Sequence, residues 1–385
     1  TTRTAGGVSG AHLSAASRGE SQPMKLVAAM ASGATGGGAE HLLGLLPALA
    51  ERGVDVTAWV GEDGPLRVEL EHAGISSAPL RLMHSRTDPM ALFALRSRLN
   101  GERPDVVHWH GTRAAFYGTL TLSGVPSVYT AHGLAYRKET SAARRSLFLG
   151  AEAVACRADQ VVSVSRTDRD DLIRHGLVRA RRAHYVPNAI RFDRFRDRPA
   201  RGAARKQLGL PQDAYLVGTT SRLVRQKAVH LTLKALEGVS GVEFVVAGDG
   251  PLRSALEADA KHRGVDVHWL GRRDDVPLVL SALDSFVLSS SWEGEPIALL
   301  EAMYCGLPCV ATATEGAVEL LADGAGYLSA VGDALALRAK LESVRTVPPD
   351  VALARRRAES RSFEAMAETV LGILEAACGR RPVER

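Results

Sequence analysis

The sequence contains few cysteines and few aromatic residues. Its four cysteines among 385 residues form no C-x-x-C pair. Cys305 and Cys309 are one helical turn apart, but no histidine or third cysteine stands near them in the sequence. This pattern argues against a disulfide framework and a zinc site, and it predicts buried thiols in a reducing compartment. Aromatic residues make up only 5%, which favours branched aliphatic cores between helices and parallel strands.

Long apolar runs are also missing. No stretch approaches the roughly 18–20 apolar residues that a membrane-spanning helix needs. Residues 1–23 are small and polar, without the apolar middle of a signal peptide, and they predict a disordered leader. The net charge of +5, from 48 basic and 43 acidic residues, is too mild to indicate a nucleic-acid partner. We therefore expect a cytoplasmic protein.

Strands alternate with helices along two stretches of the chain. Such alternation predicts βαβ units, parallel sheets and two Rossmann-like α/β domains facing a cleft. The first domain covers residues 24–190, a linker covers 191–212, and the second domain covers 213–361. A final helix over 362–378 is expected to pack back on the first domain. The predicted strands, several with the loops that follow them, cover residues 25–31, 54–60, 104–111, 126–133, 158–165, 214–223, 242–251, 265–271, 285–295 and 308–316.

Several loops at predicted strand ends carry residues suited to chemistry. Gly36, Gly37 and Gly38 open a helix, and a helix start of this kind suits a phosphate group. The spacing is not G-x-G-x-x-G, so a dinucleotide dehydrogenase is poorly supported. Arg222 and Lys227 follow a strand and bring two cations to one point, as a diphosphate requires. A pair of solvated charges is the alternative reading of these two residues.

Two glutamates separated by seven residues stand in the segment WEGEPIALLE. Glu293 lies in a loop, whereas Glu301 lies in an otherwise apolar helix. A carboxylate in that position is costly unless it is hydrogen-bonded, and ribose hydroxyl groups would serve as partners. The alternative is an ordinary exposed helical glutamate.

Histidines and aspartates raise the question of a metal. His132 ends a strand, where either a structural or a binding role is open. His108 and His110 share one face of a strand, but no acidic or cysteine ligand stands near them in the sequence, which favours a site without metal. Asp168 and Asp170 match a D-x-D pattern, yet they follow Ser165 and are better explained as the acidic first turn of a helix.

Taken together, these segments resemble the retaining glycosyltransferases of family 4, which have the two-domain GT-B fold. The resemblance spans roughly residues 24–378, and the paired-glutamate segment is its most specific part. The segments that carry it are GGGAE (36–40), HWHG (108–111), TAHG (130–133), VSVS (162–165), VPNAI (186–190), SRLVRQK (221–227), VVAGDGPLR (245–253), WLGRRDDV (269–276), WEGEPIALLEAMYCGLPCVAT (292–312) and EGAVEL (315–320).

The resemblance implies roles for particular residues. Arg222 and Lys227 match the pair that binds the donor diphosphate. His132 and Glu293 match residues beside the donor sugar, and Glu301 matches the glutamate that holds the nucleotide ribose. Six further positions match loops around the donor: Gly37 and Gly38 near phosphate and acceptor, Gly271 and Arg272 near the base, and Glu315 and Gly316 near sugar and phosphate.

The chain departs from the family pattern at three positions. Ala228 replaces a glycine, Glu295 replaces an apolar or aromatic residue, and Glu315 replaces the first of two glycines. The last two positions flank the sugar pocket, so they put the identity of the donor sugar in doubt.

The implied reaction moves a sugar from a nucleoside diphosphate sugar, with UDP-sugar expected, to an acceptor hydroxyl. No metal and no other cofactor are implied. The acceptor would be a sugar, a lipid-linked molecule or a small molecule, in glycan, glycolipid or glycosylated-metabolite synthesis. A phosphorylase, a sugar-nucleotide epimerase of the same fold and a non-catalytic sugar-nucleotide-binding protein are the alternatives.

Basic residues raise the possibility of a membrane surface. Residues 174–206 hold eleven of them, and Arg137, Lys138, Arg144 and Arg145 form a second cluster. Similar basic helices in the family lie against membranes. Weak peripheral contact with the inner membrane face is one reading, and a solvated face of an arginine-rich protein is the other.

Overall fold

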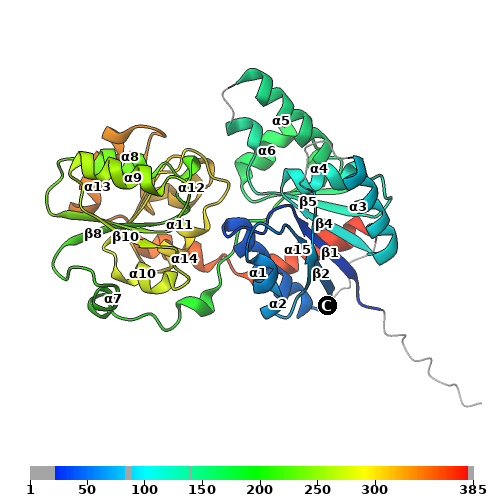
Figure 1. Ribbon diagram of the computed structural model, residues 1–385, viewed down its shortest axis with the longest axis horizontal. Coiled ribbons are helices and arrows are strands. Elements are labelled where there is room, and N and C mark those ends of the chain that lie inside the picture. Colours follow the sequence, from blue (N-terminus) through cyan, green and yellow to red (C-terminus); the bar gives the residue numbers. More distant parts are fainter. Residues whose placement is uncertain (1–21, 83–88, 139–140, 380–385) are drawn as a thin grey trace, which may run out of the picture.

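The computed structural model describes residues 22–82, 89–138 and 141–379. The predicted leader, residues 1–23, lies almost wholly outside these ranges. Within them the chain forms two α/β lobes, each built on one parallel sheet (Figure 1). The predicted fold class is therefore confirmed. None of the helices in the described ranges is long and apolar enough to cross a membrane.

The first lobe contains a seven-stranded sheet in the order β3-β2-β1-β4-β5-β6-β7, with every neighbouring pair parallel. Its strands are β1 (Lys25–Met30), β2 (Asp55–Val60), β3 (Ser76–Pro79), β4 (Val106–His110), β5 (Ser127–Ala131), β6 (Gln160–Ser163) and β7 (Ala183–Tyr185). Its helices are α1 (Gly37–Ala50), α2 (Leu66–His72), α3 (Pro89–Glu102), α4 (Thr112–Leu120), α5 (Ala142–Ala155) and α6 (Arg166–Arg174), with short 3-10 turns at Ala135–Lys138 and Ala180–Arg182.

The second lobe contains a six-stranded parallel sheet in the order β10-β9-β8-β11-β12-β13. Its strands are β8 (Tyr215–Thr220), β9 (Val242–Ala247), β10 (Val267–Gly271), β11 (Ser285–Leu288), β12 (Cys309–Thr312) and β13 (Tyr327–Ser329). Its helices are α7 (Arg201–Leu208), α8 (Val229–Leu236), α9 (Arg253–Arg263), α10 (Val276–Ala282), α11 (Ile297–Tyr304), α12 (Glu315–Leu321), α13 (Ala334–Thr346) and α14 (Val351–Glu359), with 3-10 turns at Phe192–Phe195, Arg225–Lys227 and Ala322–Gly324.

Apolar helix faces cover both sides of each sheet, as buried parallel strands require. In α1, Leu42, Leu45, Leu46 and Leu49 are fully buried on one face. The last helix, α15 (Phe363–Ala377), packs against α1 in the first lobe rather than in the second (Figure 1). The chain therefore crosses between the lobes twice, which ties the two sheets together.

The segment expected to be an irregular linker, residues 191–212, contains a helix. That helix, α7, is held in the second lobe by Arg205, whose side chain is only 4% exposed. The Arg205 guanidinium donates to three backbone carbonyl groups and forms an ion pair with Asp284 at 2.6 Å. Arg205, one of the arginines that made this segment look like an exposed linker, therefore attaches it to the second lobe.

Glu295 lies where the lobes join. Its buried carboxylate accepts a hydrogen bond from the Asn188 backbone N–H and pairs with Arg361 at 3.2 Å. Burial raises the pKa of Glu295 to about 7, although Arg361 and the Asn188 N–H oppose this. Glu295, which departs from the family pattern, thus connects residues at the junction of the two lobes. Its carboxylate is already bonded to Asn188 and Arg361.

Candidate active site

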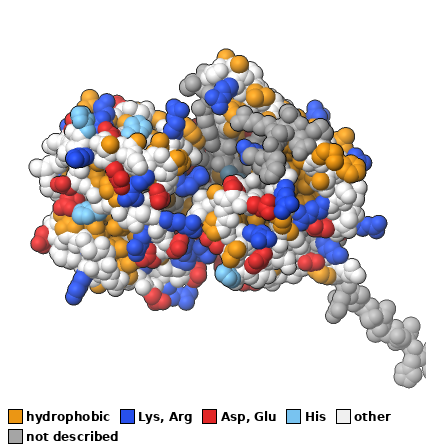
Figure 2. Space-filling model, viewed as in Figure 1, with side chains coloured by type: hydrophobic (Ala, Val, Ile, Leu, Met, Phe, Trp, Pro, Cys, Tyr) orange, Lys and Arg blue, Asp and Glu red, His pale blue; other side chains and the backbone are white. Residues whose placement is uncertain are grey.

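A cleft of about 730 Å³ runs between the two lobes. Its walls are loops that follow β1, β2, β5, β8, β9, β10 and β11, all at the carboxyl ends of parallel strands, where such sheets bind ligands. Lys and Arg side chains, interspersed with acidic ones, gather along the boundary of the lobes (Figure 2). Of the predicted site residues, those that line the cleft are Gly37, Gly38, His132, Arg222, Lys227, Arg272, Glu293 and Glu301.

The glycine loop begins α1 and faces the second lobe. Gly36 caps the helix with φ of +150°, a conformation that favours glycine. A Cβ atom on Gly36 would lie 3.3 Å from Nε of Arg222. Because the glycines have no side chains, the start of α1 lies next to Arg222 of the other lobe. The first N–H groups of a helix have no intrahelical partner. Together the helix start and Arg222 form one end of the cleft that suits an anion.

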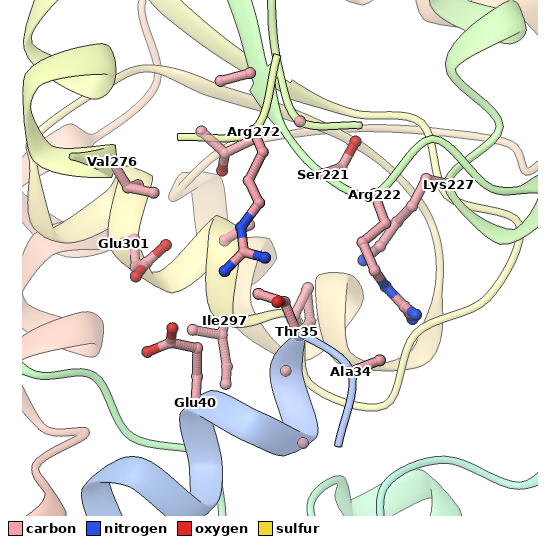
Figure 3. A pocket seen from close by; sticks show the side chains of 18 of the residues that line it. Ala34, Thr35, Glu40, Ser221, Arg222, Lys227, Arg272, Val276, Ile297 and Glu301 are labelled. Carbon is pink, nitrogen blue, oxygen red and sulfur yellow. The ribbon is translucent and has the colours of Figure 1, made fainter. Parts of the chain in front are cut away.

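The two predicted cations differ in their surroundings. The Arg222 guanidinium has no ion pair or hydrogen bond within the described part of the chain, and it points into the cleft (Figure 3). Lys227 Nζ lies 2.6 Å from Oε1 of Glu293. The prediction treated both as cations for a diphosphate, but only Arg222 offers an uncompensated charge.

Glu293 is held by several donors. Its carboxylate is 8% exposed and accepts from Ser290 Oγ at 2.6 Å as well as from Lys227. Gln226 Nε2 donates to the second oxygen at 3.4 Å and to the Trp292 carbonyl at 3.0 Å. The loop that bears Lys227 is thus locked to the loop that bears Glu293.

Ala228, the departure after Lys227, adopts the left-handed conformation with φ of +45°. An L-residue pays about 1–2 kcal/mol there, which explains why a glycine suits this position. The Ala228 and Lys227 carbonyls both accept from Ser289 Oγ at 3.1 Å, which holds the turn in place.

Glu301 forms the opposite end of the cleft. None of the described residues donates a hydrogen bond to its carboxylate, although the residue is only 8% exposed. The pKa of Glu301 is raised to about 7, mainly by burial and also by the nearby Glu40 carboxylate, against the lowering effect of Arg194 and Arg191. Figure 3 shows the Glu40 and Glu301 side chains facing each other across the lobes. This end of the cleft therefore suits hydroxyl donors.

The sequence analysis missed the partners of Glu40. This residue, in the first turn of α1, pairs with Arg191 at 3.0 Å and with Arg194 at 3.4 Å. Arg194 also donates to the carbonyl of Asp274 at 2.8 Å and lines the cleft. The GGGAE segment, which contains Glu40, was the available sequence signal for a role of Glu40 at the site. Its partners could not be inferred, because they are some 150 residues away in the sequence.

Arg272 and Gly271 occupy different places. Arg272 is about half exposed and reaches into the cleft, 3.6 Å from Glu69 of the first lobe and 3.7 Å from Asp274 (Figure 3). Gly271 ends β10, and its carbonyl accepts from the Gly248 N–H at 2.7 Å. It is not among the residues that line the cleft.

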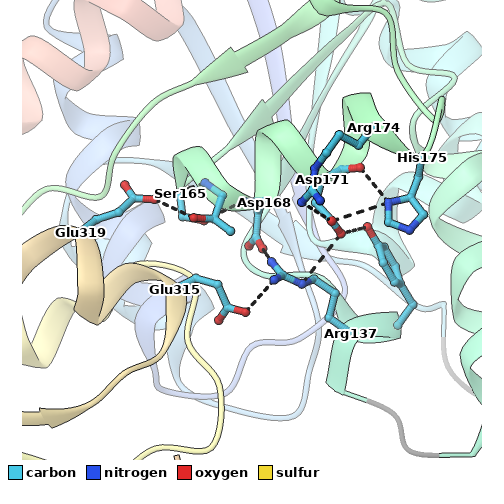
Figure 4. A network of polar contacts seen from close by, with 10 residues as sticks. Arg137, Ser165, Asp168, Asp171, Arg174, His175, Glu315 and Glu319 are labelled. Atoms are coloured by element: carbon cyan, nitrogen blue, oxygen red, sulfur yellow. Dashed lines mark hydrogen bonds and ion pairs between the residues drawn. The ribbon is translucent and has the colours of Figure 1, made fainter. Parts of the chain in front are cut away.

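Glu315 and Gly316 are not among the residues that line the cleft, and their predicted contact with sugar and phosphate stays a prediction. The Glu315 carboxylate pairs with Arg137 of the first lobe at 3.0 Å, and Arg137 also pairs with Asp168 at 3.0 Å (Figure 4). A Cβ atom on Gly316 would collide with the carbonyl of Gly294. The start of α12 therefore serves close packing and contact between the lobes.

The D-x-D pattern has the expected structural role. Ser165 caps α6, and its Oγ accepts from the Asp168 N–H at 3.1 Å. Thr167, beside the cap, contacts Glu319 of α12, which joins the same interlobe network (Figure 4). The prediction of a helix start is therefore confirmed.

His132 lies within a group of four histidines. His110 Nδ1 is 3.3 Å from His132 Nε2, and the rings of His41 and His108 pack beside them. Burial lowers the pKa of His41 to about 4 and that of His108 to about 3, and it lowers the pKa of His110 and His132 well below the usual value. All four imidazoles are therefore neutral at neutral pH.

Comparisons with known proteins cover most of the chain. Residues 200–361 match the family model of glycosyl transferases group 1, and residues 35–194 match that of glycosyltransferase family 4. The chain is 28% identical to the Escherichia coli UDP-Gal:alpha-D-GlcNAc-diphosphoundecaprenol alpha-1,3-galactosyltransferase, over 68% of this chain and 72% of that protein. It is 29% identical to the D-inositol 3-phosphate glycosyltransferase of Salinispora arenicola, over 89% and 87%.

Solved structures share the fold. Anabaena HepE in complex with UDP and glucose matches with a TM-score of 0.80 and 22% identity, over 92% of this chain and all of that one. WaaG, a glycosyltransferase involved in lipopolysaccharide biosynthesis, matches with a TM-score of 0.68 and 20% identity, over 92% and 98%. At 20–22% identity, these matches show that the two-lobed fold is shared.

Proposed function

This chain belongs to the glycosyltransferases of group 1 and family 4, and we propose that it transfers a sugar from a nucleoside diphosphate sugar to an acceptor hydroxyl with retention of configuration. The observation that carries the proposal is the polarity of the cleft. One end holds Arg222 beside the start of α1, and the other holds the buried Glu301 carboxylate; neither side chain has an ion pair or a hydrogen-bond partner among the described residues. A diphosphate fits the first end and ribose hydroxyls fit the second.

Departure of the diphosphate is the step that needs charge stabilisation. Arg222 and the N-terminus of α1 would bind the phosphate oxygens and stabilise the negative charge as the glycosidic bond breaks. Lys227 would also bind the diphosphate, although its positive charge is partly neutralised by the ion pair with Glu293. Because these groups supply positive charge, the proposed transfer needs no metal ion.

UDP-sugar is the proposed donor class. The fold neighbour HepE binds UDP-glucose, and the name of the E. coli relative specifies UDP-galactose. Glu293 and His132 line the cleft between the lobes, where they would contact the donor sugar. Lys227 and Ser290 hold the Glu293 carboxylate in place. The acceptor hydroxyl would attack from the side of the leaving diphosphate, whose oxygen would accept the proton.

The acceptor is proposed to be a sugar, a lipid-linked molecule or a small molecule. A lipid-diphosphate sugar and an inositol phosphate appear in the names of the two relatives. Of the basic residues considered for membrane contact, Arg182, Arg194, Arg198 and Arg205 bind backbone carbonyls within the chain. These four are poor candidates for membrane contact, whereas other basic residues, among them Arg144 and Arg145 of α5, are exposed and stay candidates.

A panel of nucleoside diphosphate sugars, read by the shift in melting temperature, tests donor binding. A ligand at about 100 times its Kd stabilises the folded state by about 2.7 kcal/mol. Incubation with a stabilising donor, with and without acceptors, then separates three outcomes. Acceptor-dependent product supports transfer, donor isomerisation without acceptor supports an epimerase, and binding without turnover supports a non-catalytic binder.

A further inference from the structure

Three histidines from separate elements meet at the edge of the cleft. His41 lies on α1, His110 ends β4, and His132 follows β5. One potential ligand nitrogen from each ring lies within 4.8 Å of the others. Because β1, β4 and β5 are neighbours in a parallel sheet, the loops at their carboxyl ends and the start of α1 come together, so the topology itself assembles this histidine cluster.

His41 presents a buried nitrogen without a partner. Its Nδ1 donates to Asn188 Oδ1 at 3.0 Å, and Asn188 Nδ2 in turn donates to the Glu295 carbonyl at 2.7 Å, which fixes the orientation of the amide. The second nitrogen, Nε2, therefore carries a lone pair. It has no hydrogen-bond partner within the described part of the chain, and the residue is only 2% exposed. A buried atom of this kind points to a missing ligand.

The hydrogen bond to Asn188 has a second consequence. Histidines that bind metals almost always donate their other N–H to a carbonyl or carboxylate group, which fixes the ring and leaves the opposite nitrogen as the ligand. The His41–Asn188 pair has this arrangement.

Spacing within the cluster also fits a metal. Zinc binds imidazole nitrogens at about 2.0–2.1 Å, so two tetrahedral ligands lie about 3.3 Å apart. Nδ1 of His110 and Nε2 of His132 are 3.3 Å apart. The His41 nitrogen would have to move closer to the other two, because the three candidate nitrogens now lie up to 4.8 Å apart.

We propose that His41, His110 and His132 bind one divalent transition metal, with Zn²⁺ as the ion that fits best. Three neutral imidazoles suit zinc, cobalt, nickel or copper and do not suit Mg²⁺ or Ca²⁺, which prefer oxygen ligands. His132 lines the cleft, so a water molecule from the cleft would complete the tetrahedron. The site uses neither Arg222 nor Lys227 and does not rest on the proposed transfer, although it shares His132 with the proposed donor-sugar pocket.

Metal binding is measured without donor or acceptor. Protein without a polyhistidine tag is stripped with a chelator and titrated with Zn²⁺ against a chromophoric competitor. We expect one zinc ion per chain. Co²⁺ in place of zinc is expected to give the intense visible absorption of a tetrahedral site.

Variants assign the ligands. His41→Gln and His132→Gln should each weaken zinc binding at least about tenfold. His72→Gln, at an exposed histidine of α2, is the matched control and should bind as the wild type does. His108→Gln tests the neighbouring buried ring, which packs on His110 but is outside the cluster, and it should retain zinc.

Three outcomes would overturn the proposal. They are no zinc uptake by the wild type, uptake that His41→Gln and His132→Gln leave unchanged, and a weak octahedral cobalt spectrum. The cobalt spectrum uses the wild type, so the test holds even where a variant fails to fold. Failure of metal binding leaves the transfer assay untouched, and the two proposals stay distinguishable.

Discussion

Lys227 Nζ and Glu293 Oε1 form a 2.6 Å ion pair that is largely buried at the wall of the cleft. Glu293 also accepts from Ser290 and Gln226, so the pair belongs to a closed set of hydrogen bonds. Removing one partner of such a pair leaves a buried charge alone. Lys227 therefore supports folding as well as any phosphate chemistry, whereas Arg222 forms no side-chain ion pair with any residue that the structure describes.

Substitutions at the two cations should consequently separate. Arg222→Ala is expected to reduce turnover by about 10²-fold or more, the usual loss for an electrostatic stabiliser, with little change in melting temperature. Lys227→Ala should reduce turnover similarly and also lower the free energy of unfolding by about 3 kcal/mol. Initial rates and thermal melts measure the two effects.

The double variant Lys227→Ala/Glu293→Gln provides the control. Removing the stranded carboxylate charge should restore most of the stability that Lys227→Ala loses, without restoring turnover. Near-normal turnover in both single variants would contradict the diphosphate assignment.

Glu301 should make stability depend on pH. Its folded pKa of about 7 lies above the ordinary value of 4.5, so the folded state binds more protons between these values. Stability attributable to Glu301 therefore falls as pH rises through this window. Glu301→Gln removes the effect, so its melting temperature should match the wild type near about pH 5 and exceed it near about pH 8. Equal gains at both pH values would contradict this account.

Donor binding should show the opposite trend. Ribose hydroxyls bind the ionised carboxylate better, so the affinity of the wild type for a UDP-sugar should rise from about pH 6 to about pH 8. A UDP-sugar is the suitable probe because its diphosphate does not titrate in this range. Glu301→Gln should weaken binding by about 1–3 kcal/mol near neutral pH and flatten the dependence. Isothermal titration calorimetry at each pH measures both.

Much of this arrangement followed from local sequence patterns. Buried strands, the glycine loop and the isolated Glu301 were predictable, because each depends on neighbours within one or two turns of the chain. The pairing of Lys227 with Glu293, of Glu40 with Arg194 and the meeting of the histidines were not. The first and the third of these contacts depend on the order of strands within one sheet, and the second depends on how the two lobes meet. Neighbouring residues in the sequence carry no signal for either. The pairing of Glu315 with Arg137 was not predictable either, because Arg137 is distant in the sequence and lies in the other lobe.

Glu315→Gln tests whether Glu315 contacts the donor. Because the Glu315 carboxylate contacts Arg137 and does not line the cleft, the variant should bind a UDP-sugar within about twofold of the wild type, far less than the effect of a lost hydrogen bond to a ligand. Glu301→Gln in the same titration is the comparison. A loss as large as that of Glu301→Gln would return Glu315 to the donor site.

Chelation should not abolish transfer. Arg222 and the start of α1 supply the charge that a divalent ion supplies in metal-dependent enzymes, so EDTA is expected to leave initial rates largely unchanged. Complete loss of activity that Mg²⁺ or Mn²⁺ restores would contradict a metal-independent departure of the diphosphate.

Membrane contact is the remaining prediction, and the exposed arginines of α5 offer one place to test it. Arg144, Arg145 and Leu147 are exposed on this helix, while the side chain of Lys138 lies outside the described part of the chain. A basic residue near an anionic surface contributes about 1 kcal/mol, so this small group should give weak, salt-sensitive binding. Co-sedimentation should show binding to anionic vesicles at low salt, its loss at high salt and none to neutral vesicles. Arg144→Glu/Arg145→Glu should weaken it, whereas Arg355→Glu on α14, in the other lobe, should not. Binding that ignores lipid charge would contradict the electrostatic account, and no binding at all would favour a soluble acceptor.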